Sequence, residues 1–265
     1  MKHLACAVPI LLLLASAEPR LAAQSISPPI SEYRGVKARG SFVVTNQTLF
    51  PLTVVLQPKG FKVTEDGDLY DVPLDTAVVT LRLSALSFRL QPRQAYTVFY
   101  EAQADTVPYW FNVWSGITGS KTESGINLRI ELPHVVYLYQ KLKLSATDIT
   151  IRSVRYRPAD RQIIVEFSNS SPRLGRVQSV VASADKVKSQ EAAGFPLFPE
   201  SIRRMRMPWA DTLPPQKIEV RFDGFRLAST DIVVDTTAAP PPAPVDSTAP
   251  GSVTPADARD SSTTR

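Results

Sequence analysis

The chain has few of the residues that most often build catalytic and metal sites. Its 265 residues include one cysteine, Cys6, and two histidines, of which only His134 lies beyond the first 23 residues. A lone histidine has no second one with which to share a metal ion, and a serine–histidine triad needs it in a defined constellation. The motifs Gly-x-Ser-x-Gly and His-Glu-x-x-His are missing, as is a phosphate-binding glycine loop. We therefore predict no enzyme activity, no catalytic residue, no metal site and no cofactor.

The N-terminal segment has the features of a secretory signal peptide. Lys2 supplies the positive start, Leu4–Leu14 is a short apolar run, and small residues follow it. Residues 1–23 are therefore expected to be a signal peptide, with cleavage after Ala17 or after Ala23 as the two alternatives. Cys6 would be removed with this segment, so the exported chain is predicted to contain no disulfide, no thiolate zinc site and no cysteine nucleophile.

Long apolar runs and a strong charge imbalance are also missing. The run near the N-terminus is too short to span a bilayer, so no membrane span is expected in the mature chain. The formal net charge of +5 is mild and spread along the sequence, which does not indicate a nucleic-acid partner.

What the chain does contain is a series of short β-prone runs. Segments rich in Val, Ile, Leu, Thr, Tyr and Phe recur about every 8–15 residues, separated by turn residues. They lie at 41–46, 52–57, 77–83, 95–102, 109–114, 162–169 and 217–225. This spacing is typical of antiparallel sandwiches, so the predicted fold class is all-β.

The composition also indicates how the chain is divided. An apolar run ends and polar residues return near residues 140–148, where we place a boundary between two tandem sandwich domains, at 24–140 and 141–235. Residues 236–265 are rich in Pro, Ala, Ser and Thr and contain no aromatic side chain. Such a segment cannot bury enough apolar surface to offset the entropy of ordering, so it is predicted to be a disordered tail.

Two short segments of opposite charge stand out. The first, TEDGDLYD at 64–71, is predicted to be a hairpin turn with Gly67 at its tip. Its carboxylates lack the spacing of a calcium-binding loop, which favours a solvated turn; they are Glu65, Asp66, Asp68 and Asp71. The second, RRMRM at 203–207, alternates with a period of two. We expect Arg204 and Arg206 to face solvent and the two methionines to face a core.

The pattern of residues 125–139 changes halfway. Ile126, Leu128, Ile130 and Leu132 alternate with polar residues, as in a strand with one apolar face. After Pro133 and His134 comes an unbroken apolar run, Val135–Tyr139, which is expected to be enclosed on both faces near the domain junction. Proline cannot donate a ladder hydrogen bond, so Pro133 favours a sheet edge or a bulge.

Four segments in order resemble the PapD-like periplasmic pilus chaperones. They are SFVVTNQTLFPLTVVLQ (41–57), LSFRLQPRQAYTVFY (86–100), YWFNVW (109–114) and GINLRIELPHVVYLYQK (125–141). The resemblance implies two immunoglobulin-like sandwiches with a cleft between them, in a divergent member of the family. It also implies a periplasmic location and a secreted β-rich, pilus-type subunit as partner, with an outer-membrane usher as a second candidate.

The resemblance further implies a site. Family members cap a subunit by donor-strand complementation, in which an edge strand lends alternate apolar side chains to the subunit. The corresponding residues here are Ile126, Leu128, Ile130 and Leu132.

The family's cationic anchor for the subunit's terminal carboxylate is not matched. Its arginine and lysine positions fall at Ile30 and Val136, neither of which can bind a carboxylate. The nearest cations, and so the candidates for an anchor, are Arg34, Lys37 and Lys141. Two hypotheses stay open: a periplasmic chaperone, or a non-enzymatic cell-envelope or surface protein that kept the fold without pilin-chaperone activity.

Overall fold

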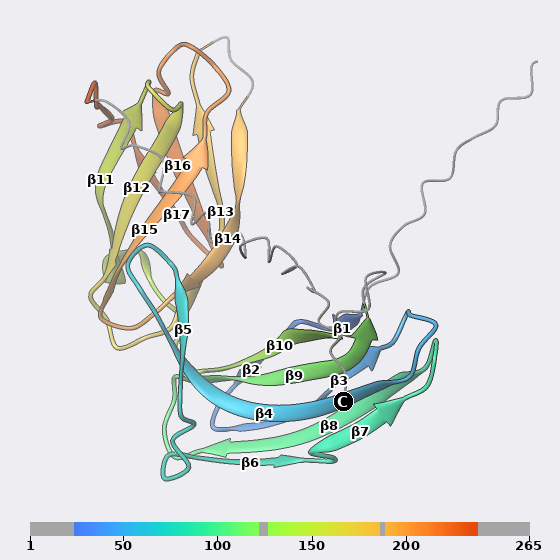
Figure 1. The fold of residues 1–265 in the computed structure, drawn as a ribbon. Coiled ribbons are helices and arrows are strands. Elements are labelled where there is room, and N and C mark those ends of the chain that lie inside the picture. Colours follow the sequence, from blue (N-terminus) through green and yellow to red (C-terminus); the bar gives the residue numbers. More distant parts are fainter. Residues whose placement is uncertain (1–23, 122–126, 186–188, 238–265) are drawn as a thin grey trace, which may run out of the picture.

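The computed structural model describes residues 24–121, 127–185 and 189–237 (Figure 1). The predicted signal peptide, the tail from residue 238 onward and Ile126 lie outside these ranges. Within them the chain is built from strands, with a single 3-10 turn, η1 (Ala146–Asp148). No helix in the described ranges is long and apolar enough to cross a membrane.

The N-terminal half forms a sandwich of two sheets. One sheet has the order β1 (Ser25–Ser27), β3 (Lys37–Thr45), β8 (Ala95–Ala104) and β6 (Val79–Leu83). The other has the order β2 (Ile30–Arg34), β10 (Asn127–Tyr139), β9 (Tyr109–Lys121), β4 (Leu52–Val63) and β5 (Leu69–Val72), with β7 (Ser87–Leu90) also paired to β4. Alternation decides which residues enter the core: in β4, residues 52, 54 and 56 are buried and residues 53, 55 and 57 are exposed.

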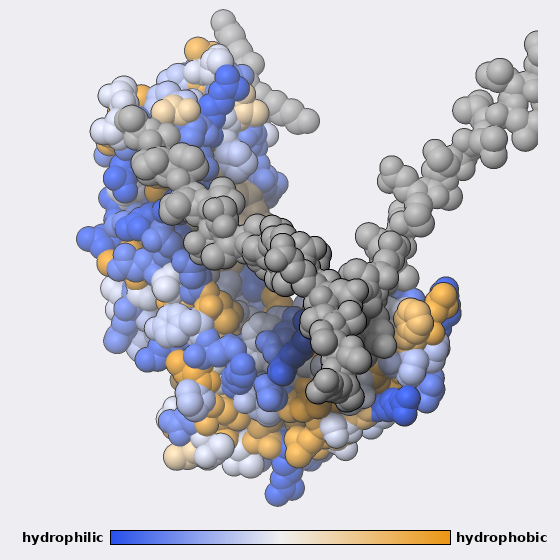
Figure 2. Space-filling model, viewed as in Figure 1, coloured by the Kyte–Doolittle hydropathy of each residue, from blue (hydrophilic) through white to orange (hydrophobic). Residues whose placement is uncertain are grey.

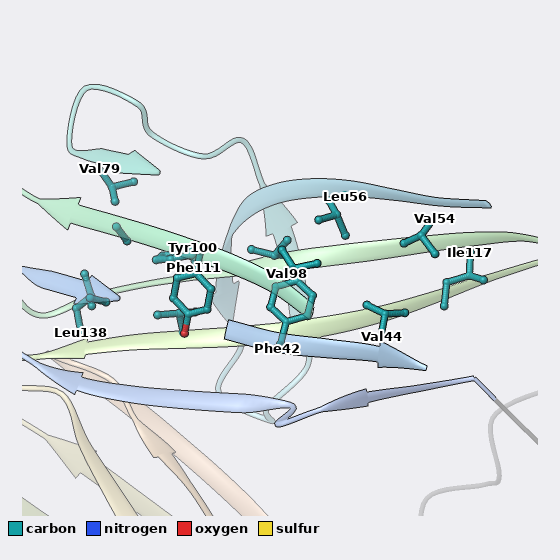
Figure 3. Close-up of a cluster of buried hydrophobic side chains, with 14 of the residues drawn as sticks. Phe42, Val44, Val54, Leu56, Val79, Val98, Tyr100, Phe111, Ile117 and Leu138 are labelled. Carbon is teal, nitrogen blue, oxygen red and sulfur yellow. The ribbon is translucent and has the colours of Figure 1, made fainter. Parts of the chain in front are cut away.

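The core of this sandwich is apolar and closely packed (Figure 3). Phe42 and Val98 from one sheet meet Val54 and Phe111 from the other, and all four are fully buried. Burial of such side chains, at about 1.5–3 kcal/mol each, is the main stabilising contribution available to a sandwich without disulfides.

The C-terminal half forms a second sandwich. One sheet has the order β15 (Ser201–Pro208), β12 (Gln162–Asn169), β11 (Ile149–Arg157) and β18 (Val233–Val234). The other has the order β14 (Gln190–Leu197), β13 (Gly175–Ser183), β16 (Lys217–Phe222) and β17 (Arg226–Ser229). The predicted fold class, all-β with two immunoglobulin-like sandwiches in tandem, is confirmed. The exact domain limits, at residues 140 and 141, stay a prediction.

The segment RRMRM lies in β15 at the edge of its sheet. Met205 and Met207 are 8% and 2% exposed and belong to the second core, as their alternation predicts. The expectation that Arg204 faces solvent is wrong, because its guanidinium contacts the turn at 64–68 of the first sandwich.

The first strand segment of the chain changes sheets. β1 pairs antiparallel with β3 in one sheet, and the chain then crosses at Pro28 and Pro29 so that β2 pairs parallel with β10 in the other. Because β2 begins only after this crossing, it pairs with the second half of β10 and not with the first.

Candidate functional site

The first half of β10 is a sheet edge. Antiparallel pairing with β9 runs from Asn127 to Leu138, whereas the parallel pairing with β2 begins only at Val135. Among the described residues, the stretch 127–133 therefore has a ladder partner on one side only. The backbone groups on its other side are available to another strand.

The side chains of this edge divide between two faces. Ile130 and Leu132 are half-buried and pack against the first core. Arg129 and Glu131 lie on the outer face, where Arg129 Nη2 is 2.8 Å from Glu131 Oε1. Of the other two predicted binding residues, Leu128 is placed by its backbone opposite Ser120, and Ile126 lies outside the described ranges. The role of these four residues stays a prediction.

A bulge interrupts β9 and leaves the alternation of β10 intact. Leu128 pairs with Ser120 and Ile130 pairs with Ile117, so the extra residue is on β9. Gly119 lies in this bulge with φ +103°, a conformation that side chains disfavour. Every second residue of β10, up to His134, consequently lies on the same face of the sheet.

Pro133 lies on the edge, and its nitrogen points away from β9. The N–H of Val135 donates to Pro29 O at 2.8 Å, on the side opposite β9. Amide groups two residues apart in a strand point the same way, so the nitrogen of Pro133 faces the open side. A proline here removes no hydrogen bond from the β9–β10 ladder, which is the reason it is tolerated within a long strand.

His134 marks where the open edge ends. Its ring is fully buried and stacks on Phe42, with 4.5 Å between the ring centroids. Nδ1 is 2.8 Å from Pro28 O, and Nε2 is 3.3 Å from Tyr100 Oη. Burial lowers the pKa of His134 below its ordinary value, although the Pro28 carbonyl acts in the opposite direction. The imidazole is therefore neutral, with Nδ1–H donating to Pro28 and Nε2 accepting from Tyr100.

The apolar run after His134 is enclosed on both faces, as its pattern predicts. Val136 and Leu138 are fully buried in the first core. Tyr137 and Tyr139 point the other way, into a cluster with Phe61 and with Leu174 of the second sandwich. The second half of β10 thus carries part of the junction between the sandwiches.

A cavity of about 240 Å³ lies between the two sandwiches next to this junction. It is lined by Glu32, Tyr33, Arg34, Tyr139, Gln140, Lys143, Leu144, Leu174, Gly175, Arg176, Gln178, Phe222, Asp223 and Phe225. Three cations and two carboxylates therefore face one small space. The charged groups of the lining therefore carry one more positive than negative charge, which suits the binding of an anion.

The charged groups of the cavity are paired with one another. Lys143 Nζ is 2.8 Å from Asp223 Oδ2, and Arg34 Nη2 is 3.9 Å from the same oxygen. Arg176 Nη1 is 3.3 Å from Glu32 Oε1, and the Tyr139 hydroxyl donates to that oxygen at 3.1 Å. Arg34 is the most weakly engaged of the three cations by distance.

The structure separates the three predicted anchor candidates. Arg34 lines the cavity, whereas Lys37 and Lys141 are exposed and are not among its lining residues. Two cations of the cavity, Lys143 and Arg176, were missed by sequence reasoning. Nothing in the local sequence marks them, because Arg176 lies in the second sandwich and meets Glu32 only through the domain arrangement.

A second polar cluster holds β5 against the first sandwich. The Asp71 carboxylate accepts hydrogen bonds from Lys59 Nζ at 2.8 Å, Trp114 Nε1 at 3.0 Å and Asn112 Nδ2 at 3.3 Å. Burial alone would raise the pKa of Asp71, but these hydrogen bonds together lower it below its ordinary value. In the described part of the chain, no three His, Cys, Asp or Glu side chains are grouped so as to hold a metal ion.

No protein-family model matches the chain, and no curated protein sequence matches it either. Several solved structures are similar in fold. A chain of the complex between the Salmonella enterica SafA pilin and the SafB chaperone has 13% identity and a TM-score of 0.48, over 80% of this chain and 97% of that chain. The class 5 fimbriae chaperone CfaA has 11% identity and a TM-score of 0.45, over 78% and 98% of the two chains.

A third similar structure is the CsuC–CsuE chaperone–tip adhesion subunit pre-assembly complex, from the archaic chaperone-usher Csu pili of Acinetobacter baumannii. It has 11% identity and a TM-score of 0.45, over 81% of this chain and 100% of that chain. At identities of 11–13%, these similarities concern the fold.

Proposed function

We propose that the protein is a periplasmic chaperone that caps a secreted β-rich subunit of the pilus type by donor-strand complementation. The observation that carries the proposal is the one-sided pairing of residues 127–133 in β10. A subunit that lacks its own final strand exposes a groove with unpaired edges, which is prone to aggregation. By covering that groove with a strand, the chaperone would prevent the subunit from aggregating.

The backbone of the edge supports the addition of a strand. Because the amide of Val135 points away from β9, the N–H and C=O groups of Arg129 and Glu131 point to the same open side. Pro133 offers a carbonyl there and no donor. The stretch 127–133 is about 23 Å long, which matches the length of an ordinary strand in a partner.

The side chains of the edge supply the specificity. Ile130 and Leu132 share one phase and are only half-buried, so each has surface left to fill pockets of a subunit. Leu128 and Ile126 continue that phase in the sequence and are proposed as the next two donor residues. His134, the following position of the phase, is fully buried and therefore closes the donor series.

The surface of the first sandwich agrees with a large protein partner. Its exposed large apolar side chains include Leu49, Phe50, Leu86 and Phe99, each more than half exposed. In the view of Figure 2, the lower sandwich shows more hydrophobic surface than the upper one. An outer-membrane usher is proposed as a second partner, which would receive the chaperone with its subunit.

For the terminal carboxylate of the subunit we propose Arg34 as the anchor. It lines the cavity, is half-exposed, and its contacts are long: a 3.9 Å ion pair with Asp223, a 3.5 Å hydrogen bond to Gln140 O and a position over the Tyr139 ring, 5.9 Å from the centroid. An incoming carboxylate therefore has only weak contacts to displace. Lys143 and Arg176 add positive charge to the same cavity. This arrangement differs from the family pattern, in which the positions of Ile30 and Val136 carry the cations.

Co-expression with a subunit encoded beside the chaperone gene tests the proposal. A stable one-to-one complex is expected, and Leu128→Asp or Ile130→Asp should abolish it while the chaperone stays folded. Thr80→Asp is the matched control, since Thr80 is exposed on β6, the edge strand of the other sheet. Unfolding of the chaperone by the Ile130 and Leu128 variants would show that these residues serve only the core, and the proposal would be wrong.

A second function, that of a non-enzymatic envelope or surface protein that kept this fold, is favoured by one observation. Ile30 and Val136 stand where the family has its cationic anchor, and Val136 is fully buried. If no subunit or usher gene lies nearby and no complex forms with any exported β-rich protein of the same cell, this second function is the better description.

A further inference from the structure

The acidic turn at 64–68 contacts the basic edge strand β15 of the other sandwich. The hairpin of β4 and β5 extends from the first sandwich to the side of β15, as Figure 1 shows. The turn at its tip is closed by two backbone hydrogen bonds: Thr64 O accepts from Gly67 N at 3.0 Å, and Thr64 N donates to Asp68 O at 2.9 Å. The two charged segments that stand out in the sequence are therefore each other's partners.

The contact combines backbone and side-chain groups. The backbone N–H of Arg204 donates to Glu65 O at 2.6 Å. One backbone donor on the open edge of β15 is therefore already hydrogen-bonded. Arg204 Nη1 lies 3.2 and 3.1 Å from the two carboxylate oxygens of Asp66, and Arg206 Nη2 donates to one of them at 3.0 Å. One carboxylate thus bridges two arginines of an edge strand.

Gly67 and Arg203 fit together closely. Gly67 has φ +98°, and a Cβ added to it would overlap the guanidinium of Arg203. The guanidinium of Arg203 also lies over the ring of Phe195, 5.3 Å from its centroid, and donates to Glu65 O at 3.4 Å. Burial lowers the pKa of Arg203, while Asp66 and Asp68 act in the opposite direction. The position favours glycine for its backbone conformation, and a larger side chain there would displace the Arg203 guanidinium.

The hairpin contact is separate from the aromatic junction. Phe198 of the second sandwich packs on Phe61 and Trp110 of the first, with ring centroids 6.2 and 4.8 Å apart. Glu65 lies four residues beyond Phe61, which is about 13 Å along an extended strand. The hairpin contact lies at a distance from the aromatic junction and from the ion pairs Arg34–Asp223 and Arg176–Glu32 beside the cavity, so it adds resistance to rotation about the connection between the sandwiches.

We propose that residues 64–68 together with Arg203, Arg204 and Arg206 form an ionic clasp, which fixes the angle between the sandwiches and closes the edge of β15. The cavity is lined from both sandwiches, by Glu32 and Arg176 among others, so the clasp also sets its width. Because part of the clasp is solvent-exposed charge, its closure depends on ionic strength.

Distance measurement between two spin labels tests the clasp. Residues 24–265 contain no cysteine, so in this part of the chain Thr80→Cys on β6 and Thr150→Cys on β11, both exposed, provide one label on each sandwich. At low salt a single narrow distance distribution is expected. Asp66→Lys and Gly67→Val should each broaden it, the first through charge and the second by displacing Arg203. At about 1 M salt the Debye length is about 3 Å, so the ion pairs are screened. The distance distribution of the protein with an unaltered clasp should then broaden as well.

A control variant and a hydrogen-exchange measurement accompany the distance measurement. Asp105→Lys removes an exposed carboxylate away from the clasp and should leave the distribution unchanged. Hydrogen exchange at the amide of Arg204 should become at least tenfold faster in Asp66→Lys than in Asp105→Lys. If Asp66→Lys is folded and keeps both the narrow distribution and the slow exchange, the clasp does not hold the sandwiches and the inference is overturned.

Discussion

His134 Nδ1 lies 2.8 Å from the carbonyl oxygen of Pro28, so the ring ties β10 to the segment that joins β1 and β2. On one side of this bond β10 is an open edge, and on the other it is covered by β2. The histidine is thus a structural boundary, held neutral within an apolar core.

A pH dependence of stability follows from this burial. The pKa of His134 is lower in the folded than in the unfolded chain, so between the two values the unfolded chain binds a proton that the folded chain does not. The free energy of unfolding should therefore be fully retained above about pH 6.5 and decrease below it, by at most about 1.4 kcal/mol per pH unit.

His134→Gln can still donate to Pro28 and should remove this part of the dependence between pH 7 and 5.5. Urea unfolding at several pH values measures it. An unchanged slope in the variant would show that other groups cause the decrease.

Pro133→Ala adds an N–H to the open edge without touching the β9–β10 ladder. We expect the free energy of unfolding to change by less than about 1 kcal/mol, mainly through the greater freedom of the unfolded chain. The additional donor makes the edge a better template, so self-association or subunit binding should increase. Sedimentation velocity detects the first and titration with a subunit the second. A loss of several kcal/mol would mean that residue 133 lies inside a two-sided ladder.

Lys59→Met should raise the pKa of Asp71 toward its ordinary value, because Lys59 gives the largest of the contributions that lower it. A carboxyl with a lowered pKa stabilises the fold above its unfolded pKa of about 4, and this contribution is lost as the pH falls through the folded pKa. Carbon-detected NMR titration of Asp71 measures the change. Lys62→Met, an exposed position in the same strand, should leave the titration of Asp71 unaltered.

Phe198→Ala should weaken the coupling between the two sandwiches. The ring contacts Phe61, Trp110 and Tyr137, and its removal takes away the second sandwich's aromatic contribution to the junction. Because the ring is half-buried, we expect a loss of about 2 kcal/mol, less than for a fully buried phenylalanine. Calorimetry should then show two separated transitions. Phe50→Ala, at an exposed loop position, should keep the original profile.

Arg34→Ala should weaken subunit binding at least tenfold if Arg34 anchors a terminal carboxylate in the cavity. Lys37→Ala and Lys141→Ala remove exposed cations outside the cavity and should change binding less than twofold. Titration with a subunit and with the same subunit amidated at its C-terminus distinguishes the anchor from general charge attraction. Equal effects of all three substitutions on both forms would contradict an anchor at Arg34.

Local chemistry explains why parts of this architecture could be predicted. Alternation with a period of two places Met205 and Met207 in a core and leaves residues 53 and 55 exposed, whatever the partner strands are. The missing N–H of Pro133 is a property of the residue itself, and it indicates an edge in any sheet. The unbroken apolar run Val135–Tyr139 likewise requires cover on both faces.

The tertiary structure alone decided which distant groups meet. Arg176 lies opposite Glu32, and Arg204 opposite Asp66, across separations of 144 and 138 residues. The sequence of the turn at 64–71 predicted its shape but not its partner, so a solvated loop was expected where an interdomain contact exists. A pattern read along one strand reports which face is apolar and which backbone groups are missing. The pairing of charges between sandwiches depends on the angle at which two finished domains pack, and no local period encodes that angle.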